Sequence, residues 1–384
     1  MQKIYLDNGA STRVADEVIE TMLPYFSEHY GNPSNSMHCF GEEAMHEIQN
    51  ATTTILEHFN SVRHGTLIYT SGASEANNLA IKGILQKAEK PCHIITSPFE
   101  HDSVLNAILS CANQNVSYSF VQVDTDGIID LDDLEKKIQP NTRLISIISA
   151  NNEIGTIQPL KKICEIAHSH GIIFHSDATQ YIATEVLDLN ITPIDLISFS
   201  AHKIYGPKGI GGLLINDKNF SIDLIPQIHG GGQQKGLRSG TLNVPGIIGM
   251  AKAFELLKKN ALRDKEKQKA LFDRFLTTFK NSQIEFCLNG SADNRIVSNI
   301  NLYFCGISSI ALLSKMPNVA ISTGSACSSN NMSPSRTISA ISNDLHRNSN
   351  SIRITTGRYN TIQEIDYVAQ KIIESVTEIK SKEA

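Results

Sequence analysis

The sequence has no long apolar run. No stretch reaches the roughly 18 consecutive apolar residues that a membrane-spanning helix needs. The first residues, 1–7, also become charged too early for the apolar core of a secretory signal peptide. These two absences argue against the membrane and secretory classes, and we therefore expect a soluble, cytoplasmic protein that has no membrane partner.

The sequence also has no excess of basic residues. It carries 34 Lys and Arg against 39 Asp and Glu, a formal net charge of −5, and shows no strongly basic block. Binding to nucleic acid relies on Lys and Arg contacts with phosphates, so we expect no direct contact with nucleic acid. The 384 residues, 41% hydrophobic and 19% charged, are typical of a globular protein long enough for about two domains.

Closely spaced cysteine pairs are absent as well. The seven cysteines are scattered and form no C-x-x-C pair, which a disulfide framework or a zinc knuckle would show. Neighbours such as His38 and Cys39, or His168 and His170, offer no convincing ligand set. We therefore expect no metal site, and we expect most cysteines to be buried as small hydrophobic residues.

Short apolar runs alternate with helical stretches between residues 66 and 215. Several runs are apolar at successive positions, as expected of strands that are buried on both faces. The expected strands are 66–69, 93–96, 116–123, 144–149, 172–175, 196–199 and 213–215, and the helices between them include 75–86, 103–113 and 160–170. This alternation predicts an α/β fold with a mostly parallel sheet covered by helices.

A second, smaller α+β unit is expected after a long helix over 247–280. Its strands lie near 298–304 and 351–355, its last helix covers 362–379, and the first dozen residues of the chain pack onto it. We therefore predict a large domain, 14–255, and a small domain made of 1–13 with 256–384. The small domain carries a polar stretch, 322–335, that we expect to be a mobile loop containing Cys327.

Three positions in the large domain suggest chemistry. Lys203 follows an expected strand and leads into a glycine turn, where it is well placed to act as a Schiff-base nucleophile. Asp177 ends another buried strand, in the crevice where such sheets bind ligands, and can pair with a protonated pyridine nitrogen. The segment 70–75 joins a strand to a helix whose first N–H groups can hold a phosphate.

Each of these features has a plain alternative. Lys203 alone fits a solvated turn lysine, Asp177 fits a helix N-cap, and the segment 70–75 fits a simple serine cap with an acidic first turn. The glycines at 209–212 lead into a strand rather than a helix, so they do not indicate a dinucleotide site.

Taken together, the motifs resemble the pyridoxal-phosphate enzymes of aminotransferase class V, and most closely the cysteine desulfurases of the NifS/IscS type. The resemblance begins at Tyr5 and extends to the last helix. The segments that carry it are 5–12, 30–34, 70–75, 100–101, 151–155, 177–180, 200–209, 229–232, 238–241 and 322–327. It implies the fold of type I pyridoxal-phosphate enzymes.

The resemblance also implies roles around the cofactor ring. Lys203 would form the Schiff base with pyridoxal 5'-phosphate, and Asp177 would pair with the ring nitrogen. His101 would stack on the ring and assist proton transfer, and Gln180 would donate to the phenolic oxygen. A packed core histidine is the alternative for His101.

Further roles concern the phosphate and the substrate. By the same resemblance, the phosphate would be held by Ala73, Ser74, Ser200 and His202. Thr241 would reach the phosphate of a neighbouring subunit, which implies a homodimer. Asn152 would contact the cofactor and, with Arg353, hold the carboxylate of L-cysteine, since the arginine fork binds a carboxylate through two hydrogen bonds. A surface ion pair is the alternative for Arg353.

Cys327 distinguishes a desulfurase from other class V enzymes. It stands in a loop with few apolar neighbours, where an exposed thiol can ionise to the nucleophilic thiolate. The resemblance implies that Cys327 takes sulfur from L-cysteine as a persulfide, releases L-alanine, and passes the sulfur to an acceptor protein of iron–sulfur assembly or nucleic-acid thiolation. The alternatives are a buried structural cysteine, a selenocysteine lyase or another class V enzyme. A silent scaffold is disfavoured because Lys203 and Cys327 are both present.

Overall fold

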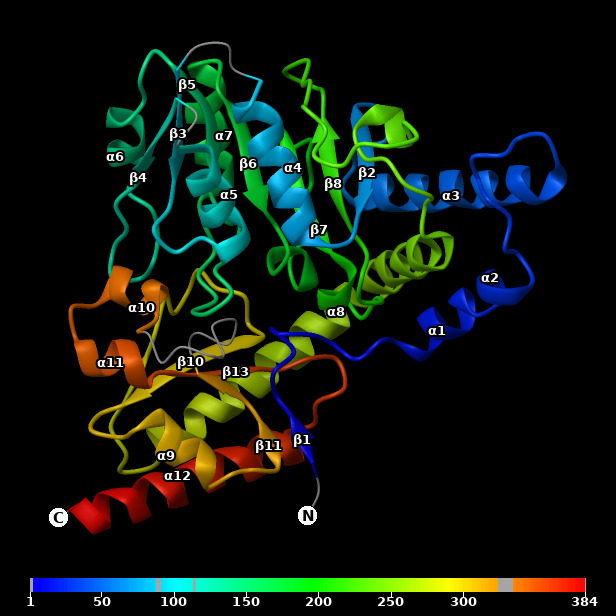
Figure 1. Ribbon diagram of the computed structural model, residues 1–384. Coiled ribbons are helices and arrows are strands. Elements are labelled where there is room, and N and C mark those ends of the chain that lie inside the picture. The colour runs from blue at the N-terminus through cyan, green and yellow to red at the C-terminus, as the bar shows by residue number, and fades with distance from the viewer. Residues whose placement is uncertain (1–2, 88–90, 113–114, 324–333, 384) are drawn as a thin grey trace.

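The computed structural model describes residues 3–87, 91–112, 115–323 and 334–383. Two units lie one above the other in Figure 1, each built around its own sheet, and a single long helix runs through both. Within these ranges, no helix is both long enough and apolar enough to cross a lipid bilayer.

The larger unit contains a seven-stranded sheet with the order β2-β8-β7-β6-β5-β3-β4. Neighbouring strands run parallel except for β8, which is antiparallel to both β2 and β7. The predicted mostly parallel sheet is therefore confirmed. The strands are β2 (Gly65–Thr70), β3 (Cys92–Thr96), β4 (Val116–Phe120), β5 (Thr142–Ser146), β6 (Ile173–Asp177), β7 (Leu196–Ser200) and β8 (Gly211–Asn216).

Helices cover both faces of this sheet, which explains the continuous apolar runs. Successive residues of a strand point to opposite faces, so Leu196 packs in the core beneath helix α4 while Ile197 packs in the core on the other side. One face is covered by α4 (Ala73–Leu85) and α5 (Asp102–Ala112), and the other by α3 (Cys39–His58), α7 (Leu160–Ser169) and the first half of α8 (Val244–Lys280). A short helix, α6 (Leu131–Lys136), lies near the edge strand β4.

The long helix α8 begins at Val244, three residues before the predicted start. Asn243 accepts a hydrogen bond from the Gly246 N–H and so caps the helix, with Pro245 inside the first turn. Phe254 packs in the core of the larger unit, and Phe275 packs in the core of the smaller one. The helix therefore joins the two units, while the exact domain boundaries stay a prediction.

The smaller unit has an antiparallel sheet with the order β12-β13-β10-β9. Its members are β9 (Phe286–Leu288), β10 (Asn299–Phe304), β12 (Ser322–Thr323) and β13 (Ile352–Thr355), accompanied by α9 (Ser309–Ser314) and α12 (Ile362–Glu383). The N-terminal strand β1 (Ile4–Tyr5) pairs with β11 (Val319–Ala320), so the start of the chain packs on this unit as expected. Two short helices, α1 (Asp16–Met22) and α2 (Pro24–Ser27), then lead back to α3.

The serine- and asparagine-rich stretch 336–350 forms two short helices, α10 (Arg336–Ile341) and α11 (Leu345–Asn350). Ser335 caps α10 by accepting from the Ile338 N–H, and Asp344 caps α11 by accepting from the His346 and Arg347 N–H groups. Polar residues at the two caps thus start both helices despite the unusual composition.

Candidate active site

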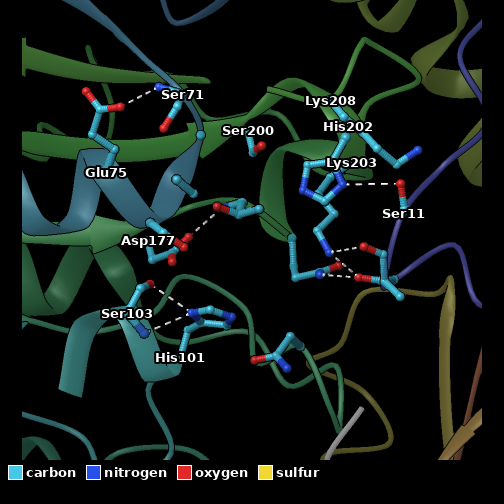
Figure 2. A pocket seen from close by; sticks show the side chains of 18 of the residues that line it. Ser11, Ser71, Glu75, His101, Ser103, Asp177, Ser200, His202, Lys203 and Lys208 are labelled. Carbon is cyan, nitrogen blue, oxygen red and sulfur yellow. Dashed lines mark hydrogen bonds between the residues drawn. The ribbon is translucent and has the colours of Figure 1, made fainter. Parts of the chain in front are cut away.

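A cavity of about 510 Å³ opens where the parallel strands β6 and β7 end (Figure 2). It brings together ten of the twelve residues predicted from the sequence. These are Ala73, Ser74, His101, Asn152, Asp177, Gln180, Ser200, His202, Lys203 and Arg353. Thr241 is exposed and is not among the lining residues of its own chain, and Cys327 lies outside the described residues.

Lys203 lies in the 3₁₀ turn (Ala201–Lys203) that directly follows β7. Its Nζ points into the cavity and donates to the carbonyl oxygens of Gly9 and Ala10, the second at 2.8 Å (Figure 2). Gln180 donates to the same Gly9 carbonyl at 2.9 Å. The N-terminal segment therefore holds the amine in place, rather than leaving it as a solvated turn lysine.

Gly9 can take this position because it has no side chain. A Cβ atom there would lie 2.9 Å from Thr355 Cγ2, and the Gly9 N–H donates to Thr355 Oγ1 at 2.7 Å. The wall formed by residues 9–11 was not predicted as part of the site, because its approach to Lys203 depends on packing between the two units.

His202 lies beside Lys203, and its Nδ1 is 3.3 Å from Ser11 Oγ. Burial, together with the positive charges of Lys203 and Lys208, lowers the pKa of His202 to about 4. The imidazole is therefore neutral at pH 7, and it can offer a single N–H donor to an anion in the cavity.

Asp177 ends β6 with its carboxylate buried at the cavity. Its Oδ2 accepts from Asn77 Nδ2 at 2.8 Å, and its Oδ1 accepts from the Thr179 N–H at 3.0 Å. The following 3₁₀ turn (Tyr181–Ala183) has no side-chain cap, so the alternative of Asp177 as an N-cap is wrong. Both hydrogen bonds fix the orientation of the carboxylate at the cavity.

Asn77 also connects this carboxylate to His101. Its Nδ2 donates to Ser103 Oγ at 2.8 Å, and Ser103 Oγ lies 2.8 Å from His101 Nδ1. The Ser103 backbone N–H also donates to Nδ1 at 3.1 Å, so this nitrogen is an acceptor and the neutral ring carries its proton on Nε2. Asn77 was missed because its burial and its contact with Asp177, 100 residues further along the chain, are defined only by the packing.

The first turn of α4, which was predicted to bind phosphate, lies at the cavity. Ala73 and Ser74 line the cavity, and the first N–H groups of a helix have no acceptor within the helix. Glu75, although in the same turn, accepts from the Ser71 N–H at 2.7 Å and forms an ion pair with Arg238 Nε at 2.9 Å. Arg238 thus offsets the negative charge of Glu75, which would otherwise repel an anion at the start of α4.

Arg353 on β13 reaches the cavity from the smaller unit. It is only 3% exposed and donates from Nη2 to Asp7 Oδ1 at 3.0 Å and from Nη1 to the Asn152 carbonyl at 3.1 Å. Among the described residues, its buried Nε has no hydrogen-bond partner. The alternative of a surface ion pair is therefore wrong, because the guanidinium is buried and held between Asp7 and Asn152.

Glu100 lies behind His101 and is almost completely buried. Its Oε1 accepts from Ser97 Oγ at 2.6 Å and from the Ile148 N–H at 2.8 Å, whereas Oε2 has no partner. Burial, reinforced by the negative charge of Asp177, raises the pKa of Glu100 to about 8 despite these two bonds. It is therefore mostly an uncharged acid at neutral pH.

Comparison with known proteins assigns this site to a family. The model of the class-V aminotransferases matches residues 4–368. Cysteine desulfurases IscS of Rickettsia bellii and Rickettsia prowazekii are each 39% identical over 378 residues, covering 98% of this chain and 92% of theirs. The chain belongs to the cysteine desulfurases of the class-V aminotransferase family.

Solved structures agree with this assignment. A NifS-like protein superposes with a TM-score of 0.89 at 31% identity and covers 98% of this chain and 100% of its own. SspA in complex with cysteine gives 0.82 at 35% identity, covering 93% and 100%. These findings confirm the predicted family, fold class, enzyme class and dependence on pyridoxal phosphate.

The side chains that line the cavity of this desulfurase match the chemical groups of pyridoxal phosphate. It offers an amine at Lys203 for the aldehyde, a carboxylate at Asp177 for the ring nitrogen, and the start of α4 for the phosphate. Beside that helix start, Arg238 offsets the negative charge of Glu75, and the neutral His202 can donate one N–H. The role of each residue toward the cofactor stays a prediction.

Proposed function

We propose that this enzyme moves the sulfur of L-cysteine onto Cys327, with the lining residues of the cavity in the roles predicted for them. The observation that carries the proposal is the convergence of Lys203, Asp177 and Arg353 on one cavity. Bound pyridoxal phosphate withdraws electrons from the Cα of an amino acid attached to it, which eases loss of the Cα proton.

The residues of the chain then bind, orient and move protons. Arg353 and Asn152 hold the substrate carboxylate, and Lys203 Nζ takes the Cα proton. Asp177, held by Asn77, would pair with the ring nitrogen of the cofactor. His101, with its proton on Nε2, faces the cavity as a donor.

The sulfur step involves one bond broken and one bond formed. The thiolate of Cys327 attacks the substrate sulfur, the Cβ–S bond breaks, and its electron pair stays with the carbon skeleton. That skeleton takes up protons and leaves as L-alanine, while the sulfur remains on Cys327 as a persulfide. The thiol of a sulfur-acceptor protein, in iron–sulfur assembly or in thiolation, then takes the sulfur.

Replacing Cys327 tests this proposal directly. In Cys327→Ser the pyridoxal-phosphate content and the resting absorption spectrum should not change, but alanine formation from L-cysteine should fall to background, because a serine hydroxyl is barely ionised at neutral pH. In the unmodified protein, cysteine treatment should add one sulfur, about 32 Da, to the Cys327 peptide. Full activity of Cys327→Ser, with the added sulfur on Cys39 or Cys305, would overturn the role of Cys327.

Two finer points belong to the same proposal. A homodimer is supported by the projecting region of α1, α2 and the start of α3, which exposes large apolar side chains (Figure 1). These are Leu23, Phe26, Tyr30, Met37 and Phe40. Sedimentation of the unmodified protein should give a dimer, and Phe26→Asp should weaken it.

Comparing alanine release from L-cysteine and from L-selenocysteine separates a desulfurase from a selenocysteine lyase.

A further inference from the structure

The described residues on either side of segment 324–333, which contains Cys327, contact Arg353 and the residue after Asn152. On the N-terminal side, Ser322 of β12 pairs directly with Arg353 of β13. On the C-terminal side, the segment leads into Ser335, the cap of α10. Residues 323 and 334, which flank the segment, are described, and among the described residues the C-terminal side is held by a side chain of the larger unit.

Glu153 makes that second contact. Its Oε2 accepts from Ser335 Oγ at 2.6 Å, and its Oε1 accepts from Thr337 Oγ1 at 3.1 Å. Both donors are 3% exposed. Two hydroxyl groups at the start of α10 are thus satisfied by one carboxyl group of the larger unit, in a place where water has little access.

An apolar contact continues the same interface. Ile154, the residue after Glu153, packs with Ile338 and Ile341 of α10 in a small separate core. The Ile338 N–H also donates to Ser335 Oγ, so the hydroxyl that reaches Glu153 is the one that starts the helix. Glu153 therefore holds α10 through hydrogen bonds, and the next residue, Ile154, holds the same helix through apolar packing.

The segment that carries Glu153 is itself fixed at the cavity. The Glu153 and Ile154 N–H groups both donate to Asn151 Oδ1, at 2.8 and 3.0 Å. The carbonyl of Asn152, the preceding residue, accepts from Arg353 Nη1. Glu153 is thus one residue from the proposed carboxylate-binding group, yet it is not among the residues that line the cavity; its carboxyl group instead contacts Ser335 and Thr337.

We infer that Glu153 is a positioning residue for the sulfur-transfer step: it holds the start of α10, the helix that follows Cys327 in the chain, beside Asn152. This inference rests on the proposed role of Cys327. Glu153 does not contact cofactor or substrate, so earlier steps at the cavity do not depend on it. Misplacement of a reacting group by about 1 Å can cost roughly a hundredfold in rate.

The test uses the holoenzyme and separates the two stages. Glu153→Ala should keep its pyridoxal-phosphate content and the spectral change on adding L-cysteine, while persulfide formation on Cys327, followed by quenched mass spectrometry, slows about tenfold or more. Backbone amides of 335–341 should exchange hydrogen faster. Glu165→Ala, at an exposed site on α7, is the matched control and should match the unmodified protein in every readout.

A second variant keeps the inference testable if Glu153→Ala does not fold. Ser335→Ala combined with Thr337→Val removes the same two hydrogen bonds from the other side and should reproduce the slow transfer. Adding Glu153→Ala to this double variant should slow persulfide formation little further, because Glu153, Ser335 and Thr337 form one set of hydrogen bonds. Persulfide formation at the normal rate in these variants would overturn the inference. A loss of the spectral change on adding L-cysteine as large as the loss of persulfide formation would overturn it as well. Absence of persulfide on Cys327 in the unmodified protein would instead overturn the proposed function.

Discussion

Arg353 and Asp7 come from opposite ends of the chain and meet at the cavity, with Nη2 and Oδ1 3.0 Å apart. Both residues belong to the smaller unit, where Asp7 forms a parallel β-bridge with Thr355 of β13. Asp7 fixes one side of the guanidinium, and the Asn152 carbonyl fixes another. The guanidinium of Arg353 is therefore held in one orientation at the cavity by residues of both units.

Arg353→Lys should raise the KM for L-cysteine about 10- to 100-fold, because a lysine keeps the charge but loses the planar fork and one charged hydrogen bond. The resting cofactor spectrum should not change. Steady-state kinetics of alanine formation measure the effect, with Arg143→Lys on the exposed side of β5 as control. An unchanged KM would show that another group binds the carboxylate.

Lys203→Ala should retain no covalently attached pyridoxal phosphate after borohydride treatment, since the amine that reacts with the aldehyde is gone. Mass spectrometry of the reduced protein gives the answer. Lys208→Ala is the matched control because Lys208 lines the same cavity, and it should still be labelled. Labelled Lys203→Ala protein would place the attachment on another lysine.

Asp177→Asn should bind pyridoxal phosphate and yet turn over roughly 10² to 10³ times more slowly, because a neutral amide cannot balance a protonated ring nitrogen. The measured quantity is kcat for alanine formation at saturating L-cysteine. Asp126→Asn, an exposed substitution, should behave like the unmodified protein. Turnover close to normal would remove the electrostatic role of Asp177.

Glu100 should make the protein less stable as pH rises. Its folded pKa, about 8, lies above the unfolded value near 4.5, so the folded state binds the extra proton between these values. Its contribution to stability is complete below about pH 4.5 and is lost progressively up to about pH 8.

Glu100→Gln mimics the protonated acid and should remove this pH dependence. Its melting temperature should exceed that of the unmodified protein at pH 8, and the difference should shrink toward pH 5. Thermal unfolding of both proteins across that range provides the test. Parallel curves for the two proteins would mean that Glu100 stays ionised in the folded state.

Much of the sheet and of the cavity was predictable because both depend on local signals. Runs that are apolar at every position mark strands buried on two faces, and polar residues directly after them, such as Asp177 and Lys203, fall at the ligand-binding edge. The resemblance to the family then pointed to Arg353 in the smaller unit. The antiparallel direction of β8 had no such signal, because strand direction depends on how the chain returns to the sheet.

The residues that were missed act through partners far along the chain. Asn77 is 100 residues from Asp177, and Glu153 is 182 residues from Ser335. A side chain of this kind has no local pattern, since its hydrogen-bond partner is defined only when helices and strands pack. The carbonyls of Gly9 and Ala10 are a still clearer case, because any residue type supplies a carbonyl.

The pairing of β2 with β8 also has a consequence during biosynthesis. These neighbours are separated by about 140 residues, and such distant pairs close late because the intervening loop must first be ordered. The turn predicted to bind phosphate follows β2, whereas Lys203 precedes β8, and β2 joins the sheet only through β8 in the described strand order. A nascent chain on the ribosome therefore cannot bring β2 and the turn after it into this sheet until β8 has emerged.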